Sequence, residues 1–84
     1  MPTIASLLPG RTYQVIREFT DYDQRVHAVG EVWTFIASNF APYDDGMLLQ
    51  IRQHGELGSF RMQWRPESQA RVMDSFTSYV RAAR

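Results

Sequence analysis

The feature that most constrains this fold is a pair of neighbouring segments in which apolar and polar residues alternate. The segments are "MLLQIRQ", which begins at Met47, and "LGSFRMQW", which ends at Trp64. Successive side chains of a β-strand point to opposite faces, so each segment predicts a strand with one buried face. A two-residue turn at Gly55 and Glu56 places every apolar residue opposite another. The predicted pairs are Ile51 with Phe60, Leu49 with Met62, and Met47 with Trp64.

The same matching extends to "EVWTFIAS", a further alternating segment that begins at Glu31. Its alignment with the segment 47–54 brings apolar faces together and leaves residues 40–44 as the hairpin loop. The segment 11–19 is also predicted as a strand, because apolar residues again recur on one side of it. That side carries Tyr13, Val15 and Phe19. In the hairpin formed by the segments 31–39 and 47–54, the predicted pairs on the core face are Trp33 with Ile51, Phe35 with Leu49 and Ala37 with Met47. On its outer face, Ile36 is predicted to pair with Leu48.

The residues after Trp64 have a different period. Pro66 suits the first position of a helix, and Glu67 favours its positive end. The apolar residues that follow recur at helical spacing, which predicts a helix over about 66–82 with one face packed on the sheet. That face comprises Val72, Met73, Phe76, Tyr79, Val80 and Ala83.

These segments predict a mainly β fold with one helix (α+β). The chain of 84 residues, 44% apolar and 21% charged, has the composition of a single globular domain, 1–84. The expected strands form a four-stranded antiparallel meander that can curl into an SH3-like barrel, with the C-terminal helix packed on it. Their expected bounds are about 11–19, 31–39, 47–54 and 57–64.

The charge and the cysteine count exclude several classes of function. The formal net charge is zero, and all nine basic residues are arginine. Neutrality argues against a general nucleic-acid or membrane-surface binder, which needs a positive excess. With no Cys there is no disulfide, thiolate metal site or thiol nucleophile. The apolar run near the N-terminus is too short for a signal peptide or a membrane span, so we expect a soluble cytoplasmic protein.

Metal binding and catalysis have weak support. The acidic pairs Asp21/Asp23 and Asp44/Asp45 lack the further ligands of a calcium loop, and turn formation explains them better. His27 and His54 share no metal-ligand spacing. We therefore expect no cofactor, no metal and no catalytic residue. The alternative is a ligand-binding or catalytic pocket in which His27 titrates beside Asp21 or Asp23.

A nucleic-acid module is a further, less favoured alternative. Aromatic platforms and arginines on a small barrel can bind single strands. Trp33 and Trp64, however, align with the expected core face rather than with a surface platform. The arginines that could share an edge or face of the sheet are Arg17, Arg52, Arg61 and Arg65.

The favoured hypothesis is a non-enzymatic module that binds a protein or peptide. The loops 21–30 and 40–45 each combine aromatic and acidic residues, and exposed aromatics are typical anchors at interfaces. The acidic residues would then select a basic partner, and a homodimer through Ile36 and Leu48 is a second way to use the outer face. The opposing interpretation is that the tyrosines only cover the core. The candidate binding residues are Asp21, Tyr22, Asp23, His27, Phe40, Tyr43 and Asp44.

One family resemblance covers most of the chain. The run from Pro9 to Arg52 resembles a family of small bacterial proteins classed as a domain of unknown function. The resemblance implies no activity, cofactor or substrate. The matching residues are Tyr13, Val15, Phe19, Asp21, Tyr22, Asp23, His27, Val29, Gly30, Glu31, Trp33, Phe35, Phe40, Pro42, Tyr43, Asp44, Asp45, Gly46 and Leu49.

Overall fold

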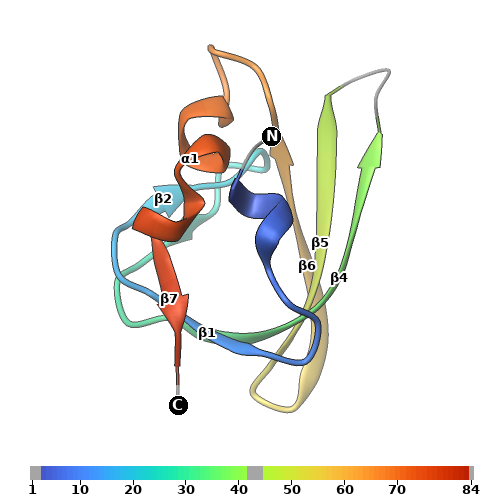
Figure 1. Cartoon of the computed structure of the whole chain (residues 1–84), viewed down its shortest axis with the longest axis vertical. Coiled ribbons are helices and arrows are strands. Elements are labelled where there is room, and N and C mark those ends of the chain that lie inside the picture. The colour runs from blue at the N-terminus through green and yellow to red at the C-terminus, as the bar shows by residue number, and fades with distance from the viewer. Residues whose placement is uncertain (1–2, 42–44, 84) are drawn as a thin grey trace.

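A computed structural model describes residues 3–41 and 45–83 of the chain. Its main feature is a curved five-stranded antiparallel sheet in the order β6-β5-β4-β1-β7 (Figure 1). A small two-stranded sheet, β2-β3, lies between β1 and β4 in sequence. The bounds are β1 (Thr12–Val15), β2 (Phe19–Thr20), β3 (Val26–His27), β4 (Val32–Ala41), β5 (Gly46–Gln53), β6 (Glu56–Gln63) and β7 (Val80–Ala82).

Short helical segments cover the inner side of the curved sheet (Figure 1). They are the 3₁₀ helix η1 (Thr3–Ser6), the helix α1 (Ala70–Asp74) and the 3₁₀ helix η2 (Phe76–Ser78). Between the sheet and these helices lies one continuous apolar core. Its buried members are Ile4, Leu7, Tyr13, Val15, Phe19, Trp33, Phe35, Met47, Leu49, Ile51, Phe60, Met62, Met73, Phe76, Tyr79 and Val80.

The fold class is confirmed in outline: the fold is mainly β, antiparallel, with a short helix. The four expected strands lie side by side in chain order, as β1, β4, β5 and β6. The SH3-like barrel is not formed by the described strands, because β6 and β7 remain as the two edges of the sheet. The expected strand 11–19 is also too long, since β1 ends at Val15 and Phe19 belongs to the small sheet.

The predicted helix over 66–82 is wrong. Only residues 70–74 are α-helical, and the chain then passes through η2 into β7. Ser75, Thr77 and Ser78 are weak helix formers whose hydroxyls compete for backbone groups. The outer edge of β1 also needs partners, and β7 supplies them by pairing Val80 with Val15. The predicted apolar face is nevertheless mostly buried, because Met73, Phe76, Tyr79 and Val80 all reach the core.

The hairpin of β5 and β6 exists, but its predicted register is two residues off. The loop is His54-Gly55 rather than Gly55-Glu56, and both loop residues have positive φ, 54° and 79°. This is the geometry of a type I′ turn, whose twist matches that of the strands. The offset keeps every side chain on its predicted face but changes its partner. Leu49 now pairs with Phe60 and Met47 with Met62.

Trp64 was predicted to lie in the core, and this prediction is wrong, because Trp64 lies beyond the end of β6 and is partly exposed. Its side chain is 38% exposed, and its indole Nε1–H donates to Asp74 Oδ1 at 2.9 Å. Trp33 is buried as predicted.

A β-bulge between Phe35 and Ala37 overturns the predicted register of β4 and β5. Phe35 pairs with Ile51 before the bulge, and Ala37 pairs with Gln50 after it. The extra residue in β4 shifts the pairing of all later residues of β4 by one position relative to β5. Leu48 is therefore opposite Asn39 instead of Ile36. The strands also extend to Ala41 and Gly46, so the hairpin loop is shorter than the predicted 40–44.

Candidate functional site

The loop that joins β2 to β3 is fixed by a buried aspartate. Asp21 has no exposed surface, and its Oδ2 lies 2.9 Å from His27 Nε2. Its Oδ1 accepts the backbone N–H groups of Asp23 and Arg25 at 2.9 and 3.1 Å. An aspartate that accepts backbone donors in this way forms the turn around itself. Asp21 therefore determines where the neighbouring side chain of Tyr22 points.

The other ring nitrogen of His27 is bonded as well. His27 Nδ1 lies 2.6 Å from Glu31 Oε2, and the Trp33 indole Nε1–H donates to the same oxygen at 3.2 Å. The imidazole stacks on Phe19, with ring centroids 4.6 Å apart, and is only 7% exposed. Carboxylate oxygens accept hydrogen bonds, so a ring nitrogen that carries a proton can donate to the carboxylate it faces. Both ring nitrogens of His27 thus face a carboxylate, and the hydrogen bonds join Asp21, Glu31 and Trp33 into one polar chain.

The loop between β2 and β3 also forms an exposed contact with β6. We call this contact the Tyr22 clasp (Tyr22, Asp23 and Arg61). The Tyr22 N–H donates to the Arg61 carbonyl at 2.8 Å. The Arg61 guanidinium lies 5.5 Å from the centre of the Tyr22 ring. It also donates to Asp23 through Nη2 at 2.6 Å and Nε at 3.2 Å. These hydrogen bonds from Arg61 hold the pKa of Asp23 below its usual value, and the nearby charges of Arg61 and Arg25 act in the same direction.

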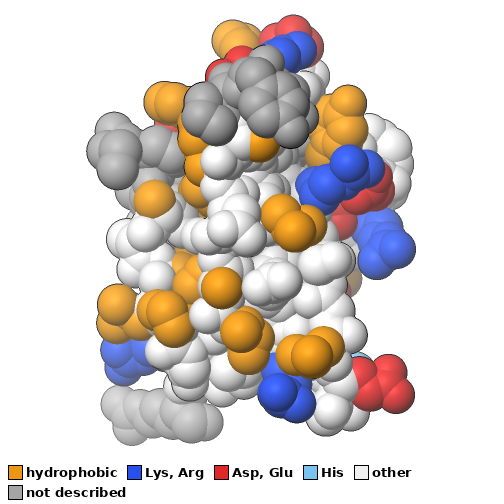
Figure 2. All heavy atoms as spheres, turned by 90° about the vertical axis from the view of Figure 1, so that its right-hand side faces the viewer, with side chains coloured by type: hydrophobic (Ala, Val, Ile, Leu, Met, Phe, Trp, Pro, Cys, Tyr) orange, Lys and Arg blue, Asp and Glu red, His pale blue; other side chains and the backbone are white. Residues whose placement is uncertain are grey.

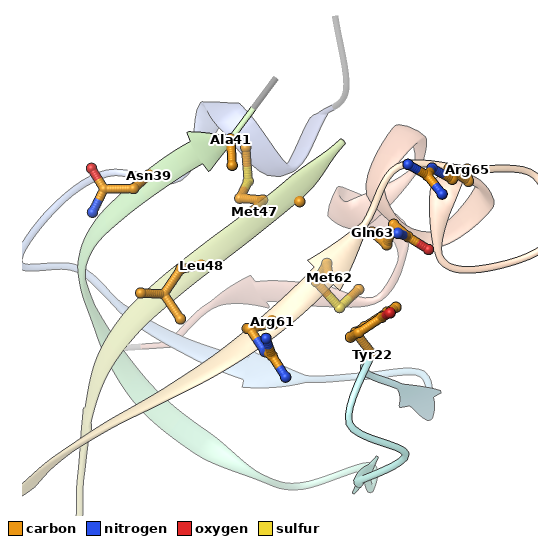
Figure 3. Close-up of a pocket in the computed structure, with 10 residues that line it drawn as sticks. Tyr22, Asn39, Ala41, Met47, Leu48, Arg61, Met62, Gln63 and Arg65 are labelled. Atoms are coloured by element: carbon orange, nitrogen blue, oxygen red, sulfur yellow. The ribbon is translucent and has the colours of Figure 1, made fainter. Parts of the chain in front are cut away.

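Beside the Tyr22 clasp lies an open hollow of about 300 Å³, which we call the Tyr22 groove (Figure 3). Met47, Leu48 and Met62 give it an apolar lining, and Tyr22 and Arg61 stand at one side. Arg65 also lines it, and its Nε donates to Asp45 Oδ2 at 3.1 Å. The remaining lining residues are Asn39, Ala41, Gly46 and Gln63. The groove thus combines apolar, aromatic and cationic groups at the surface.

A second hollow, of about 270 Å³, is lined by residues of β3 and of β6. We call it the β3–β6 hollow. His27, Ile51 and Phe60 contribute ring and apolar surface, and Arg25, Glu31 and Gln53 contribute polar groups. Val26, Gly58 and Ser59 complete its lining.

The structure brings together four of the predicted site residues: Asp21, Tyr22 and Asp23 lie on the loop between β2 and β3, and His27 lies on β3. Phe40 lies on β4, exposed and paired with Met47, but does not line the Tyr22 groove. The predicted residues Tyr43 and Asp44 lie outside the described residues. Sequence reasoning missed Leu48, Met62 and Arg61 as lining residues, and Glu31 as a partner of His27. Their alternation was visible, but the approach of the loop to the edge of β6 was not.

Three of the predicted rim aspartates are paired with basic side chains in the part of the chain that the structure describes. Asp21 is bonded to His27, Asp23 to Arg61, and Asp45 to Arg65. The basis for selecting a basic partner is therefore removed for these three residues. The predicted arginine face is also dispersed, because Arg61 and Arg65 line the groove while Arg17 lies over the ring of Tyr79.

The face of the molecule that carries β4 and β5 has scattered apolar side chains (Figure 2). Backbone and non-hydrophobic, uncharged side chains, drawn white, lie between most of these apolar side chains. Ile36 and Leu48 are both half-buried, and the bulge keeps them from pairing. A homodimer through these two residues stays a prediction.

Within 3–41 and 45–83, no group of His, Cys, Asp and Glu side chains is arranged to hold a metal ion. In the same ranges, no helix has both the length and the apolar character needed to cross a membrane.

Comparisons with known proteins agree with the resemblance seen in the sequence. The family model of a domain of unknown function, DUF3601, matches residues 5–82. Among solved structures, an integron cassette protein from the mobile metagenome of Vibrio cholerae is 30% identical, with a TM-score of 0.90. The alignment covers 99% of this chain and 92% of that protein. A search of curated proteins gives no match.

Proposed function

Because this chain belongs to DUF3601, a bacterial family whose description states no activity, we propose its function from its own geometry. The proposed function is that of a non-enzymatic interaction module, which binds a peptide segment of another protein in the Tyr22 groove. The observation that carries the proposal is an open groove with both apolar and polar lining, beside a tyrosine and an arginine that hydrogen bonds of the loop position. Interface hot spots are rich in these two residue types.

The groove is organised before any partner arrives. Asp21 fixes the turn, Asp23 fixes the Arg61 guanidinium, and the Tyr22 N–H fixes the loop to β6. Tyr22 nevertheless keeps 43% of its surface exposed. A side chain that is already ordered loses little conformational entropy on binding, which favours affinity.

The lining predicts what the groove receives. The thioethers of Met47 and Met62 are flexible and polarisable, so they adapt to an inserted apolar side chain. A volume of about 300 Å³ accommodates a few side chains rather than a large cofactor. An arginine has five N–H donors, and Arg65 donates to Asp45 through Nε, so its guanidinium can also bind a backbone carbonyl or a carboxylate. We propose an apolar peptide segment with an acceptor group close by.

The bonding of His27 supports a non-enzymatic role. A general base needs a free lone pair within reach of a substrate. Both nitrogens of His27 face carboxylates at 2.9 and 2.6 Å. The residue instead supports the loop that carries Tyr22.

The test uses peptides selected on the wild-type protein from a displayed library of short random sequences. Methionine methyl groups labelled with ¹³C then report the binding site by NMR. A peptide in the groove is expected to shift the methyl signals of Met47 and Met62 and to leave Met73, which is buried away from the groove, unchanged. A selection in which no peptide moves the first two signals contradicts the proposal.

Matched variants separate the groove from the rest of the surface. Tyr22→Ala and Leu48→Ser are expected to weaken groove binders by about tenfold or more, because each removes part of the lining. Val29→Ser is the control, since Val29 is more exposed than Tyr22 and does not line the groove. Equal affinities of the Tyr22→Ala variant and the control variant would place the binding site elsewhere.

A further inference from the structure

The free edge of β6 is closed along one half and open along the other. The backbone groups of an antiparallel strand point alternately toward and away from the neighbouring strand. Trp64 N–H donates to the Asp45 carbonyl next to β5, and the Arg61 carbonyl accepts Tyr22 N–H on the opposite side. The register of β5 and β6 has no irregularity. The odd-numbered residues of β6 therefore point their backbone groups away from the sheet.

These outward groups are satisfied near the C-terminal end of β6. Gln63 N–H donates to the side chain of Gln69, and the Gln63 carbonyl accepts Gln69 N–H at 2.9 Å. The Arg61 carbonyl accepts the N–H of Tyr22. The loop 21–25 and the segment around Gln69 thus protect this half of the edge, as edge strands in soluble proteins require.

The other half has no such protection. Leu57 and Ser59 also point their backbone N–H and C=O groups outward, and neither has a hydrogen-bond partner for them within residues 3–41 and 45–83. Leu57 is 71% exposed, so its side chain does not cover the edge. Two donors and two acceptors in strand geometry remain unused.

The β3–β6 hollow lies along this open half. Its lining includes Gly58 and Ser59 of β6, Val26 of β3, and the apolar residues Ile51 and Phe60. Val26 is unpaired in the same sense. Asp21 N–H donates to the Arg25 carbonyl, so the backbone groups of Val26, the next residue, point away from β2. The hollow is therefore bordered on both sides by backbone that can accept another strand.

We propose that an extended segment of another protein chain adds as a strand to β6 at Leu57–Ser59 and occupies the β3–β6 hollow. Strand addition of this kind uses main-chain hydrogen bonds for affinity and a side-chain pocket for specificity. Ile51 and Phe60 give the hollow an apolar part, and Arg25, Glu31 and Gln53 give it a polar part. The residue that enters the hollow therefore has an apolar stem and a polar end. The small sheet borders the hollow, which favours one extended strand over the edge of a second copy of this chain. This site is separate from the Tyr22 groove.

The test again uses short random peptides selected on the wild-type protein, now read by hydrogen exchange of backbone amides. One class of selected peptides is expected to slow the exchange of Leu57 and Ser59 N–H. The amides of Gly58 and Phe60, which already pair with β5, serve as internal references. A selection that yields no peptide protecting Leu57 and Ser59 overturns the proposal.

Two variants test the backbone and the hollow separately. Ser59→Pro removes one outward N–H, and Ser59→Ala keeps it while removing the same hydroxyl. Proline is tolerated at edge positions whose N–H faces solvent. We expect Ser59→Pro to weaken these peptides by about tenfold and Ser59→Ala by less than about twofold. Equal effects of the two substitutions would overturn the strand pairing.

Gly58→Val keeps all outward backbone groups and fills the hollow. A Cβ at this position meets only Ile51 Cγ1, at 4.0 Å, and valine favours strands, so the variant is expected to fold. Affinity for the protecting peptides should again fall by about tenfold, while Tyr22→Ala should leave it unchanged. If Tyr22→Ala lowered the affinity for these peptides and Gly58→Val did not, the peptides would bind in the Tyr22 groove, and the proposal would be overturned.

Discussion

Asp21 and Asp23 lie two residues apart on one loop and perform opposite tasks. Asp21 is fully buried and joins His27, Glu31 and Trp33 in a continuous chain of hydrogen bonds. Asp23 is exposed and binds the Arg61 guanidinium through both oxygens. Both form short hydrogen bonds with a basic partner, so bond length does not distinguish them. Burial does, because water reaches Asp23 and can replace its partner, whereas Asp21 has no exposed surface.

This difference separates the rigidity of the loop from its exposed surface. The buried chain determines the conformation of the loop, and the Tyr22 clasp determines what the loop presents. Substitutions in the first should therefore affect the free energy of unfolding, and substitutions in the second mainly binding.

The largest expected effect is that of Asp21→Ala. It leaves His27 Nε2 and the N–H groups of Asp23 and Arg25 without their acceptor. Breaking a buried, hydrogen-bonded pair costs about 3–5 kcal/mol, a large part of the total stability of a small domain. Urea unfolding followed by fluorescence should show a large fall in the midpoint. A loss no greater than that of Asp23→Ala would break the comparison.

Glu31→Gln is expected to have an intermediate effect. The amide oxygen can still accept from Trp33 and His27, but the charge that strengthens both bonds is gone. Because the Glu31 side chain is partly exposed, we expect a loss of about 1–2 kcal/mol in the free energy of unfolding. The NMR signal of the Trp33 indole N–H should move at the same time. An unchanged indole signal would mean that the Trp33 bond does not form in solution.

Asp23→Asn should change stability least. Exposed ion pairs are screened by salt and contribute little. We expect a small decrease in the urea midpoint at low salt that disappears at high salt. The Tyr22 ring signals should shift in both conditions, because Arg61 loses its anchor. A large salt-independent loss would show that Asp23 belongs with the buried chain.

Acid pH provides a titration of the same clasp. Hydrogen bonds from Arg61 lower the pKa of Asp23, so its contribution is complete above the unfolded pKa of about 3.9 and is lost as pH falls through the lower folded value. The side-chain carboxyl signal of Asp23, followed by ¹³C NMR, should titrate at lower pH in the wild type than in Arg61→Ala. Coincident titration curves would contradict the assigned cause.

Much of the sheet was predictable, because a strand with one face buried in the core and one face in solvent has alternating apolar and polar residues. Met47, Leu49, Ile51, Phe60 and Met62 all lie on the buried face as predicted. The exact partners were not predictable. A turn of His54-Gly55 and a bulge at Ile36 each depend on backbone geometry that neighbouring strands impose.

The helical prediction failed for a related reason. Apolar residues that recur every three or four positions need not belong to one long helix. They can be buried equally well when a short helix, a 3₁₀ turn and an edge strand each place some of them against the core. Met73 and Phe76 are buried in helical turns, whereas Val80 is buried in β7. The need of β1 for a partner on its outer edge decided between them, and no local pattern records that need.

The candidate site was predicted only as a set of residue types. The sequence indicated that Tyr22 and its acidic neighbours were candidates for binding, and that His27 was the residue most suited to titrate. It could not separate Asp21 from Asp23, because nothing local states which one the core will cover.

By itself, then, the sequence determined a neutral, cysteine-free, mainly β chain and the faces of its central strands, since those follow from side-chain alternation and hydrophobic burial. The tertiary structure alone decided the strand partners, the edge strand β7, the buried bonds of His27 and the two hollows. The strand partners, β7 and the hollows depend on contacts between segments far apart in the chain, such as Tyr22 with Arg61, whose distance no local pattern specifies. The bonds of His27 join near neighbours in the sequence, but the core that buries them is built from distant segments.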